Sequence, residues 1–296
     1  MTRTIDPNNT PPKDMHQYLL GAVSPRPIAL ISTIDEQGTP NLAPYSFYNA
    51  FSSNPPIVVF SSNRRLGDNT TKDTLYNVRK QGEVVVNAVS YDIVRQMTIA
   101  SIEYPSDVSE FEKSGLTPIA SEEVSPFRVK ESPVQMECKV QEIIPLGDQG
   151  GAGHLIICKV LKIHVSEEVL DPDGKINPHK IDLMGRMGRA FYVRASGEAV
   201  MTIMQPVTQI GIGYQQLPIS ARQSNILTGN DLGRLSGIKK APTKDDVLEI
   251  KLTDEIANLL QGENVIENLH RRAQIELSKE DVTLAAKLVW LAEEFK

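Results

Sequence analysis

The chain has 296 residues, a formal net charge of −6, 40% hydrophobic residues and 23% charged residues. This composition is ordinary for a globular protein, so it excludes a disordered or fibrous chain, and the acidic balance argues against nucleic-acid binding, which needs a basic face. No apolar run approaches the ~20 residues that cross a bilayer, and residues 1–10 lack the apolar centre of a signal peptide, so we expect a cytoplasmic protein with no membrane partner.

Metal binding and thiol chemistry find no support in the sequence. The five histidines show no ligand spacing for zinc, and there is no C-x-x-C motif, so no metal site is expected. Cys138 and Cys158 lie in apolar, strand-like runs, which predicts buried free thiols.

The first third of the chain begins with a proline-rich polar segment. Residues 1–13 are expected to form an N-terminal arm laid over the surface. A short helix is predicted over 14–21 and a strand over 27–33, in which both alternating sets of side chains are apolar, so both faces should be buried. The turn residues 35–38 predict that the following segment returns on this strand as a hairpin.

A second group of elements follows the double proline at residues 55 and 56. The apolar run 56–61 predicts a strand, and a helix should run from Thr71 or Asp73 to Lys80, with Thr or Asp as its N-cap and Gly82 at its end. A strand over 83–89 and a helix over 92–101 complete this group.

The longest apolar runs, 133–144 and 154–165, flank a glycine-rich segment and predict a hairpin. About six strands joined mostly by turns favour a closed antiparallel barrel over a βαβ sheet. Apolar positions recur at helical spacing from Leu252 onward. We therefore predict a mainly β fold with helices, a barrel domain over 14–200 and a mainly helical C-terminal extension over 201–296.

Cations and hydroxyls gather beside the predicted helix start. The segments Ser61-Ser-Asn-Arg-Arg65 and Thr70-Thr-Lys-Asp-Thr74 offer positive charge, hydroxyl donors and free backbone N–H groups, which is the combination that a phosphate needs. The alternative is a solvated loop before an ordinary helix cap.

An aromatic segment, Pro44-Tyr-Ser-Phe-Tyr48, follows the first hairpin. A planar cofactor can pack against such side chains, although aromatic residues in strands are more often part of the core. Arg26 stands between two prolines and could meet a phosphate or a substrate carboxylate, or form a surface ion pair.

His154 opens a strand directly after the glycine-rich segment 147–153, where a side chain can project from a barrel rim. The alternative is a structural histidine. The glycines lack G-x-G-x-x-G spacing and are better interpreted as a hairpin tip, and no dinucleotide fingerprint, Walker sequence or G-x-S-x-G elbow is present.

Five segments together resemble the flavin reductase-like family of FMN-binding split barrels, which includes flavoredoxins. They are Ser24-Pro-Arg-Pro-Ile-Ala-Leu-Ile-Ser-Thr33, Asn41-Leu-Ala-Pro-Tyr-Ser-Phe47, Ser52-Ser-Asn-Pro-Pro56, Lys72-Asp-Thr74 and Glu83-Val-Val-Val-Asn87. The resemblance covers about residues 14–200. It implies a six-stranded antiparallel Greek-key split barrel that forms a homodimer, with FMN at the subunit interface.

The resemblance also implies roles for particular residues. The segment from Ala43 through Pro44, Tyr45 and Ser46 to Phe47 would face the isoalloxazine ring, and the phosphate end would be held by Ser61, Ser62, Arg64, Lys72, Asp73 and Thr74, with Arg26 as a further cofactor-binding candidate. His154 falls where reductases of the family often carry a histidine near the nicotinamide, but Ala-Gly precedes it here in place of Gly-Asp.

The function implied is an NAD(P)H:flavin oxidoreductase, in which NADH or NADPH passes a hydride to flavin N5. Because the cofactor supplies this chemistry, no acid-base pair is required. Three alternatives remain open: an FMN-carrying electron-transfer protein that serves a protein acceptor, a flavoprotein whose extension admits a quinone or aromatic substrate, and a module without ligand.

Overall fold

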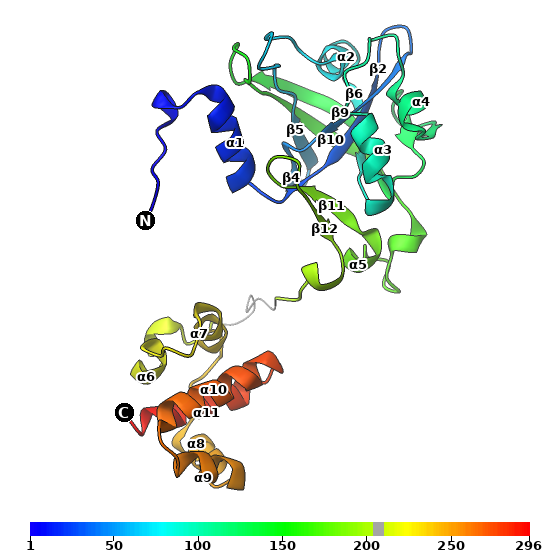
Figure 1. Ribbon diagram of the computed structural model, residues 1–296. Coiled ribbons are helices and arrows are strands. Elements are labelled where there is room, and N and C mark those ends of the chain that lie inside the picture. Colours follow the sequence, from blue (N-terminus) through cyan, green and yellow to red (C-terminus); the bar gives the residue numbers. More distant parts are fainter. Residues whose placement is uncertain (204–209) are drawn as a thin grey trace. The chain divides into compact units, whose positions relative to one another are not determined.

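The computed structural model describes residues 1–203 and 210–296, so the part of the expected helical extension at 204–209 lies outside the described residues. The chain divides into two compact units, Met1–Met201 and Thr202–Lys296, which are described in turn (Figure 1).

The first unit is built on a seven-stranded antiparallel sheet with the order β3-β2-β6-β9-β10-β5-β4. Its strands are β2 (Ala29–Ile34), β3 (Pro40–Tyr45), β4 (Tyr48–Ser53), β5 (Pro56–Ser61), β6 (Glu83–Ala88), β9 (Val134–Pro145) and β10 (His154–Val165). Two small sheets join β1 (Arg26–Pro27) to β11 (Leu183–Arg186) and β12 (Tyr192–Ala195), and β7 (Pro118–Ile119) to β8 (Arg128–Val129).

The two predicted hairpins are confirmed. Asp35–Gly38 turns β2 into β3, and the glycine-rich segment joins β9 to β10. The first five residues of β2 are buried, as its doubly apolar pattern predicts. The sheet has one strand more than the six expected, because the chain turns back at Pro55 and pairs β4 with β5. β4 is an edge strand and is exposed along most of its length.

Helices surround the sheet of the first unit: α1 (Pro12–Ala22), α2 (Asp73–Gln81), α3 (Val94–Ile99), α4 (Glu110–Ser114) and α5 (Pro178–Ile181). The predicted helix over 92–101 begins as a 3-10 turn, Tyr91–Ile93, and continues as α3. α2 ends at Gly82, which adopts the left-handed conformation (φ 69°) that glycine accepts without strain. It packs on β2 and β3, and this contact places its N-terminus beside the barrel.

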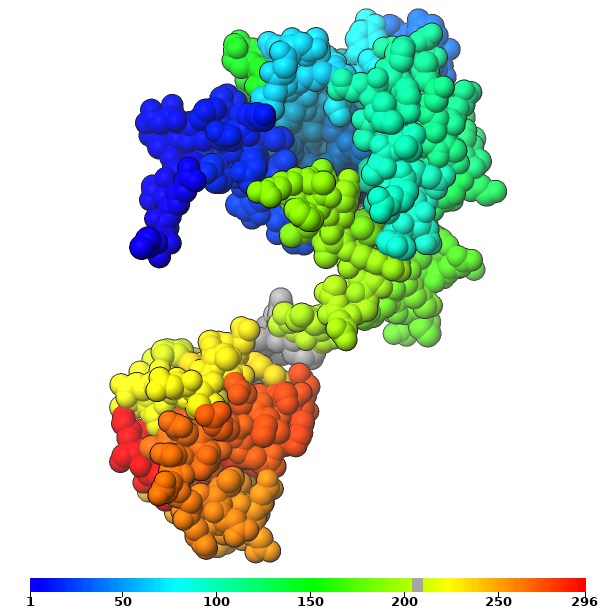
Figure 2. Space-filling model, viewed as in Figure 1, coloured from blue at the N-terminus to red at the C-terminus, as the bar shows by residue number. Residues whose placement is uncertain are grey.

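The N-terminal segment differs from the expectation of an arm laid over the surface. Figure 2 shows residues 1–10 (dark blue) projecting from the rest of the first unit. A capped 3-10 turn at Pro7–Asn9 precedes α1, with the Asp6 side chain accepting from Asn8 N.

The second unit is helical over its described part and has its own buried core. Its helices are α6 (Ile219–Arg222), α7 (Gly229–Ser236), α8 (Lys244–Lys251), α9 (Asp254–Leu260), α10 (Val265–Ser278) and α11 (Val282–Glu293). Thr228 and Thr243 start α7 and α8 with capping boxes that pair with Asp231 and Asp246. In the described residues, no helix combines the length and apolarity that crossing a membrane requires.

Candidate functional site

The strand β5 ends at the hydroxyl-rich segment, which pairs with the start of β10. Ser62 N donates to His154 O and His154 N donates to Ser62 O, both at 3.1 Å. Glycine at position 153 leaves room for the Ser61 hydroxyl, because a Cβ there would lie only 2.5 Å from that oxygen. The end of the glycine-rich segment therefore packs against Ser61 and Ser62 and helps to position them.

A cation and several hydroxyls meet around Tyr45. The Lys72 ammonium lies 5.2 Å from the centre of the buried Tyr45 ring. Burial raises the pKa of Tyr45, and the hydroxyls of Thr74 and Ser62 are near enough to oppose that shift. The hydroxyl oxygens of Tyr45 and Ser62 are nevertheless buried, and no described residue offers either of them a hydrogen-bond partner of good geometry. Such unpaired buried groups are rare, which points to a missing ligand or water.

The N-terminus of α2 lies in this same cluster. The predicted helix start is confirmed, but its predicted cap is wrong: Lys72 occupies the cap position and makes no side-chain cap hydrogen bond. Lysine has no acceptor atom, so the first N–H groups of α2 stay free and carry the positive end of the helix dipole. Burial lowers the pKa of Lys72, and no carboxylate of the described residues forms an ion pair with it.

A small hollow opens at the start of α2, and Tyr45, Ser61 and Ser62 are not among its lining residues. Lys72, Asp73 and Thr74 line it together with Ala43 and Asn41. The Asn41 side-chain amide donates to the hydroxyls of Thr33 and Thr74, each at 3.0 Å, and so links β3 to the start of α2. Sequence reasoning missed further lining residues, of which Arg65, Glu103 and Glu110 are charged.

Two arginines in the loop after β5 have different roles. Arg64 donates to the side chain and the backbone carbonyl of Asn69, at 2.6 and 2.8 Å, so its guanidinium closes the loop. Arg65 lines the hollow and forms an ion pair with Glu103 at 2.7 Å. Neighbouring side chains in this loop point in different directions, so Arg65 faces the hollow and Arg64 does not. The sequence alone does not fix these directions in a loop.

The aromatic segment connects β3 to β4, and Ala43, Pro44, Ser46 and Phe47 are half-buried. Arg26 lies beneath it and is almost fully buried. Its guanidinium donates to the carbonyls of Leu20, Val23 and Met187, and its Nε lies 3.4 Å from the Ser46 hydroxyl. The guanidinium is therefore committed to backbone carbonyls and does not face the hollow.

His154 does not project from the rim, and its burial fits the alternative of a structural histidine. Its side chain is only 2% exposed, and Nδ1 lies 3.1 Å from the Ser62 carbonyl oxygen. The reason is that the backbone at Gly153 lies close to Ser61, so the start of β10 is covered by the loop that follows β5.

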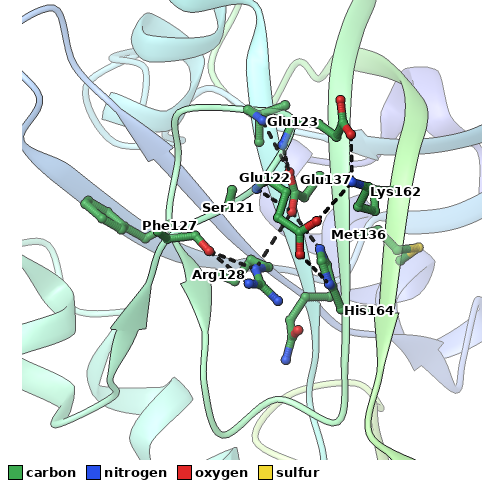
Figure 3. Close-up of polar contacts among 12 residues, drawn as sticks. Ser121, Glu122, Glu123, Phe127, Arg128, Met136, Glu137, Lys162 and His164 are labelled. Atoms are coloured by element: carbon green, nitrogen blue, oxygen red, sulfur yellow. Dashed lines mark hydrogen bonds and ion pairs between the residues drawn. The ribbon is translucent and has the colours of Figure 1, made fainter.

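A second cluster of charged side chains surrounds Glu137 on β9 (Figure 3). Its fully buried carboxylate accepts the backbone N–H groups of Glu122, Glu123 and Val124 and lies 2.7 Å from His164 Nε2. These hydrogen bonds outweigh burial and lower the pKa of Glu137. Every acceptor position is occupied, so the cluster fastens the 121–125 loop and offers no open group for catalysis.

Comparison with known proteins places this geometry in a family. Residues 21–180 match the family described as flavin reductase like domain. The chain belongs to the flavin reductase-like family. The expected mainly β split-barrel class is thereby confirmed for the first unit, with seven strands in its main sheet.

Relatives of this flavin reductase-like chain cover its first unit. An uncharacterised protein of Aquifex aeolicus is 40% identical over 189 residues, which span 64% of this chain and 94% of that protein. Nitrilotriacetate monooxygenase component B from Bacillus cereus is 31% identical, with a TM-score of 0.63 over 69% of this chain and 98% of that one. The 2-nitrobenzoate 2-nitroreductase of Pseudomonas fluorescens is 25% identical, with a TM-score of 0.60 over 69% of this chain and 97% of that one.

Proposed function

We propose that the first unit binds FMN and acts as an NAD(P)H-dependent flavin reductase. One observation carries this proposal: Lys72 stands at the uncapped start of a helix, beside buried hydroxyls, and among the described residues the lysine has no ion-pair partner and the hydroxyls of Tyr45 and Ser62 have no hydrogen-bond partner. A phosphate monoester would supply the negative charge and acceptor oxygens that these groups lack.

The proposed phosphate end is smaller than the set inferred from the family resemblance. Lys72 contributes charge, Ser61, Ser62 and Thr74 contribute hydroxyls, and Asp73 contributes its backbone N–H, since its carboxylate would repel the anion. Arg65 replaces Arg64, because Arg65 lines the hollow, where it also pairs with Glu103, whereas Arg64 does not line it. We leave Arg26 out, since backbone carbonyls hold its guanidinium.

The ring of the cofactor would lie along the segment from Ala43 to Phe47. A bound FMN would supply the redox chemistry, with N5 as the atom that would take the hydride of NADH or NADPH. The chain itself has to hold the ring, exclude water from its face and leave room for a nicotinamide. His154 is too deeply buried to contact a nicotinamide, so we assign it to the support of Ser62 rather than to catalysis.

We further propose that FMN lies at the interface of a homodimer. The edge strand β4 follows the ring-binding segment, and its side chains are almost all exposed, with Phe51 at 69%. An unpaired edge bearing an aromatic side chain is a surface that proteins usually cover.

The absorption spectrum of the purified protein tests this function. Protein reconstituted with FMN should show a flavin spectrum that bleaches on anaerobic addition of NADH or NADPH. A colourless protein that takes up no FMN would contradict the cofactor assignment. A flavin spectrum that neither nicotinamide bleaches would contradict the reductase assignment alone.

A second function is an electron carrier that serves a partner enzyme. The likeness to a monooxygenase component favours it, because such a component works with another protein. Steady-state oxidation of NADH or NADPH with added free FMN separates the two functions, since a carrier would show negligible turnover.

A further inference from the structure

The second unit contains a cavity of about 560 Å³. It lies between the segment that follows α6, the first turn of α10 and the residues after α11, with Ser224, Val265, Ile266 and Phe295 among its lining residues. This volume falls within the range of ~300–1,000 Å³ typical of small-molecule sites, so a few waters do not account for it.

His270 lines the cavity and is 99% buried, being 1% exposed. Its Nδ1 lies 3.0 Å from the Ser224 hydroxyl oxygen, which accepts backbone N–H groups from Ile226 at 3.0 Å and Leu227 at 3.1 Å. A hydroxyl has two acceptor positions and one proton. With both positions filled, Ser224 has only its proton left for His270, so Nδ1 is the acceptor.

The hydrogen bond from Ser224 fixes the protonation of the ring. If Nδ1 accepts, the ring proton is on Nε2, and Nε2–H is a donor. This atom is buried and has no partner among the described residues. Burial lowers the pKa of His270, so the ring is neutral at pH 7 and retains this single donor. An unpaired buried donor destabilises the protein, and a ligand that accepts from it removes this cost.

The same cavity meets the uncapped start of a long helix. α10 has 14 residues, and its N-cap residue, Asn264, makes no side-chain cap bond. The N–H groups of Val265, Ile266 and Glu267 therefore have no acceptor within the helix. Lys296 and the exposed Glu267 also line the cavity. The negative charges of Glu293 and Glu267 act on His270, and Lys296 supplies the positive charge that opposes them.

We infer that this cavity binds a small organic acid, whose carboxylate accepts from His270 Nε2–H and the first turn of α10 while its apolar body packs on Val265, Ile266 and Phe295. A carboxylate matches the several donors and the positive end of the helix. Because the cavity also has apolar lining residues, an organic acid fits it better than an inorganic anion does.

Benzoate and its neutral isostere benzamide provide the test on the full chain. With ¹⁵N-histidine labelling, NMR should show His270 as the Nε2–H tautomer, and benzoate should shift its resonances saturably at millimolar concentrations. Benzamide should bind at least fivefold more weakly. The His270→Asn variant identifies the resonances, and it should weaken benzoate about fivefold, because asparagine retains an acceptor near the Nδ1 position but lacks the Nε2 donor.

Two variants of exposed residues, which need not disturb folding, test whether positive charge at the cavity strengthens benzoate binding and negative charge weakens it. Lys296→Gln should weaken benzoate, and Glu267→Gln should tighten it about two- to fivefold, with little change for benzamide. Lack of saturable benzoate binding up to 10 mM would overturn the inference. An Nδ1–H tautomer, or benzamide binding as tightly as benzoate, would overturn it equally.

Discussion

The ammonium of Lys72 lies 5.2 Å from the centre of the Tyr45 ring, at the first turn of α2. Lys80, on the same helix, lies 5.8 Å from the Tyr76 ring but is exposed and pairs with Glu36 at 3.8 Å. The two lysines thus share a ring contact and differ in burial and in having a counter-ion. They form a matched pair for testing the phosphate site.

Replacing Lys72 with methionine should weaken FMN binding by roughly 1–3 kcal/mol, because a charge-assisted hydrogen bond to the phosphate is lost while the apolar stem remains. Lys80→Met should leave the Kd unchanged. Fluorescence titration of FMN measures both. Equal Kd values for wild type and Lys72→Met would remove Lys72 from the site.

Gly153→Ala should destabilise the first unit by about 1 kcal/mol, since the new Cβ would lie 2.5 Å from the Ser61 hydroxyl oxygen and displace that hydroxyl from its hydrogen bond to Asn63. FMN affinity should fall with it. Gly67→Ala, where no atom lies within 4 Å of the added Cβ, is the control. Thermal unfolding reports stability, and a Gly153→Ala protein as stable as the control would contradict the close approach.

Glu137→Gln should lower the stability of the first unit by about 3 kcal/mol at pH 7, because the buried carboxylate binds three backbone N–H groups and His164. The folded-state pKa of Glu137 is lowered, so its contribution is present above the usual glutamate pKa of ~4.3 and is lost as the pH falls below that value. The difference between wild type and variant should therefore shrink in acid.

Calorimetry at pH 7 and below pH 4 measures this difference. Glu123→Gln, which affects only a solvent-exposed ion pair with Lys162, should change stability by less than ~1 kcal/mol. A Glu137→Gln deficit that stays constant with pH would show that packing, rather than charge, sets its effect.

Phe51→Lys should convert the proposed homodimer to a monomer, because it places a charge on the exposed edge strand β4. Phe191→Lys is the control, since Phe191 is similarly exposed, at 65% against 69%, but lies outside β4. Light scattering after size-exclusion chromatography gives the mass. A Phe51→Lys dimer would exclude β4 from the interface.

The sequence predicts the backbone of the site better than its side chains. The turn at Asp35–Gly38, the stop at Gly82 and the glycine-rich hairpin are local signals, and each element ends close to where these residues indicate. Lys72 and Thr74 flank Asp73, the first residue of α2, so their closeness to each other also follows from local structure.

Side-chain direction depends on contacts that are distant in sequence. Arg26 is held by the nearby carbonyls of Leu20 and Val23 and also by the Met187 carbonyl, 161 residues away. His154 is buried by pairing with Ser62, 92 residues away. Neither distant partner can be identified from the residues beside the arginine or the histidine. The choice of Arg65 over Arg64 depends likewise on Glu103, which has no motif of its own.

The hydrogen bonds of Asn41 to Thr33 and Thr74 have a kinetic consequence. They fasten the start of α2 to the sheet during folding. The corner that would receive a phosphate is therefore preorganised, and phosphate binding requires little rearrangement of the protein. Flavins that differ only away from the phosphate should then associate at similar rates, and their affinities should differ mainly in how long each one stays bound.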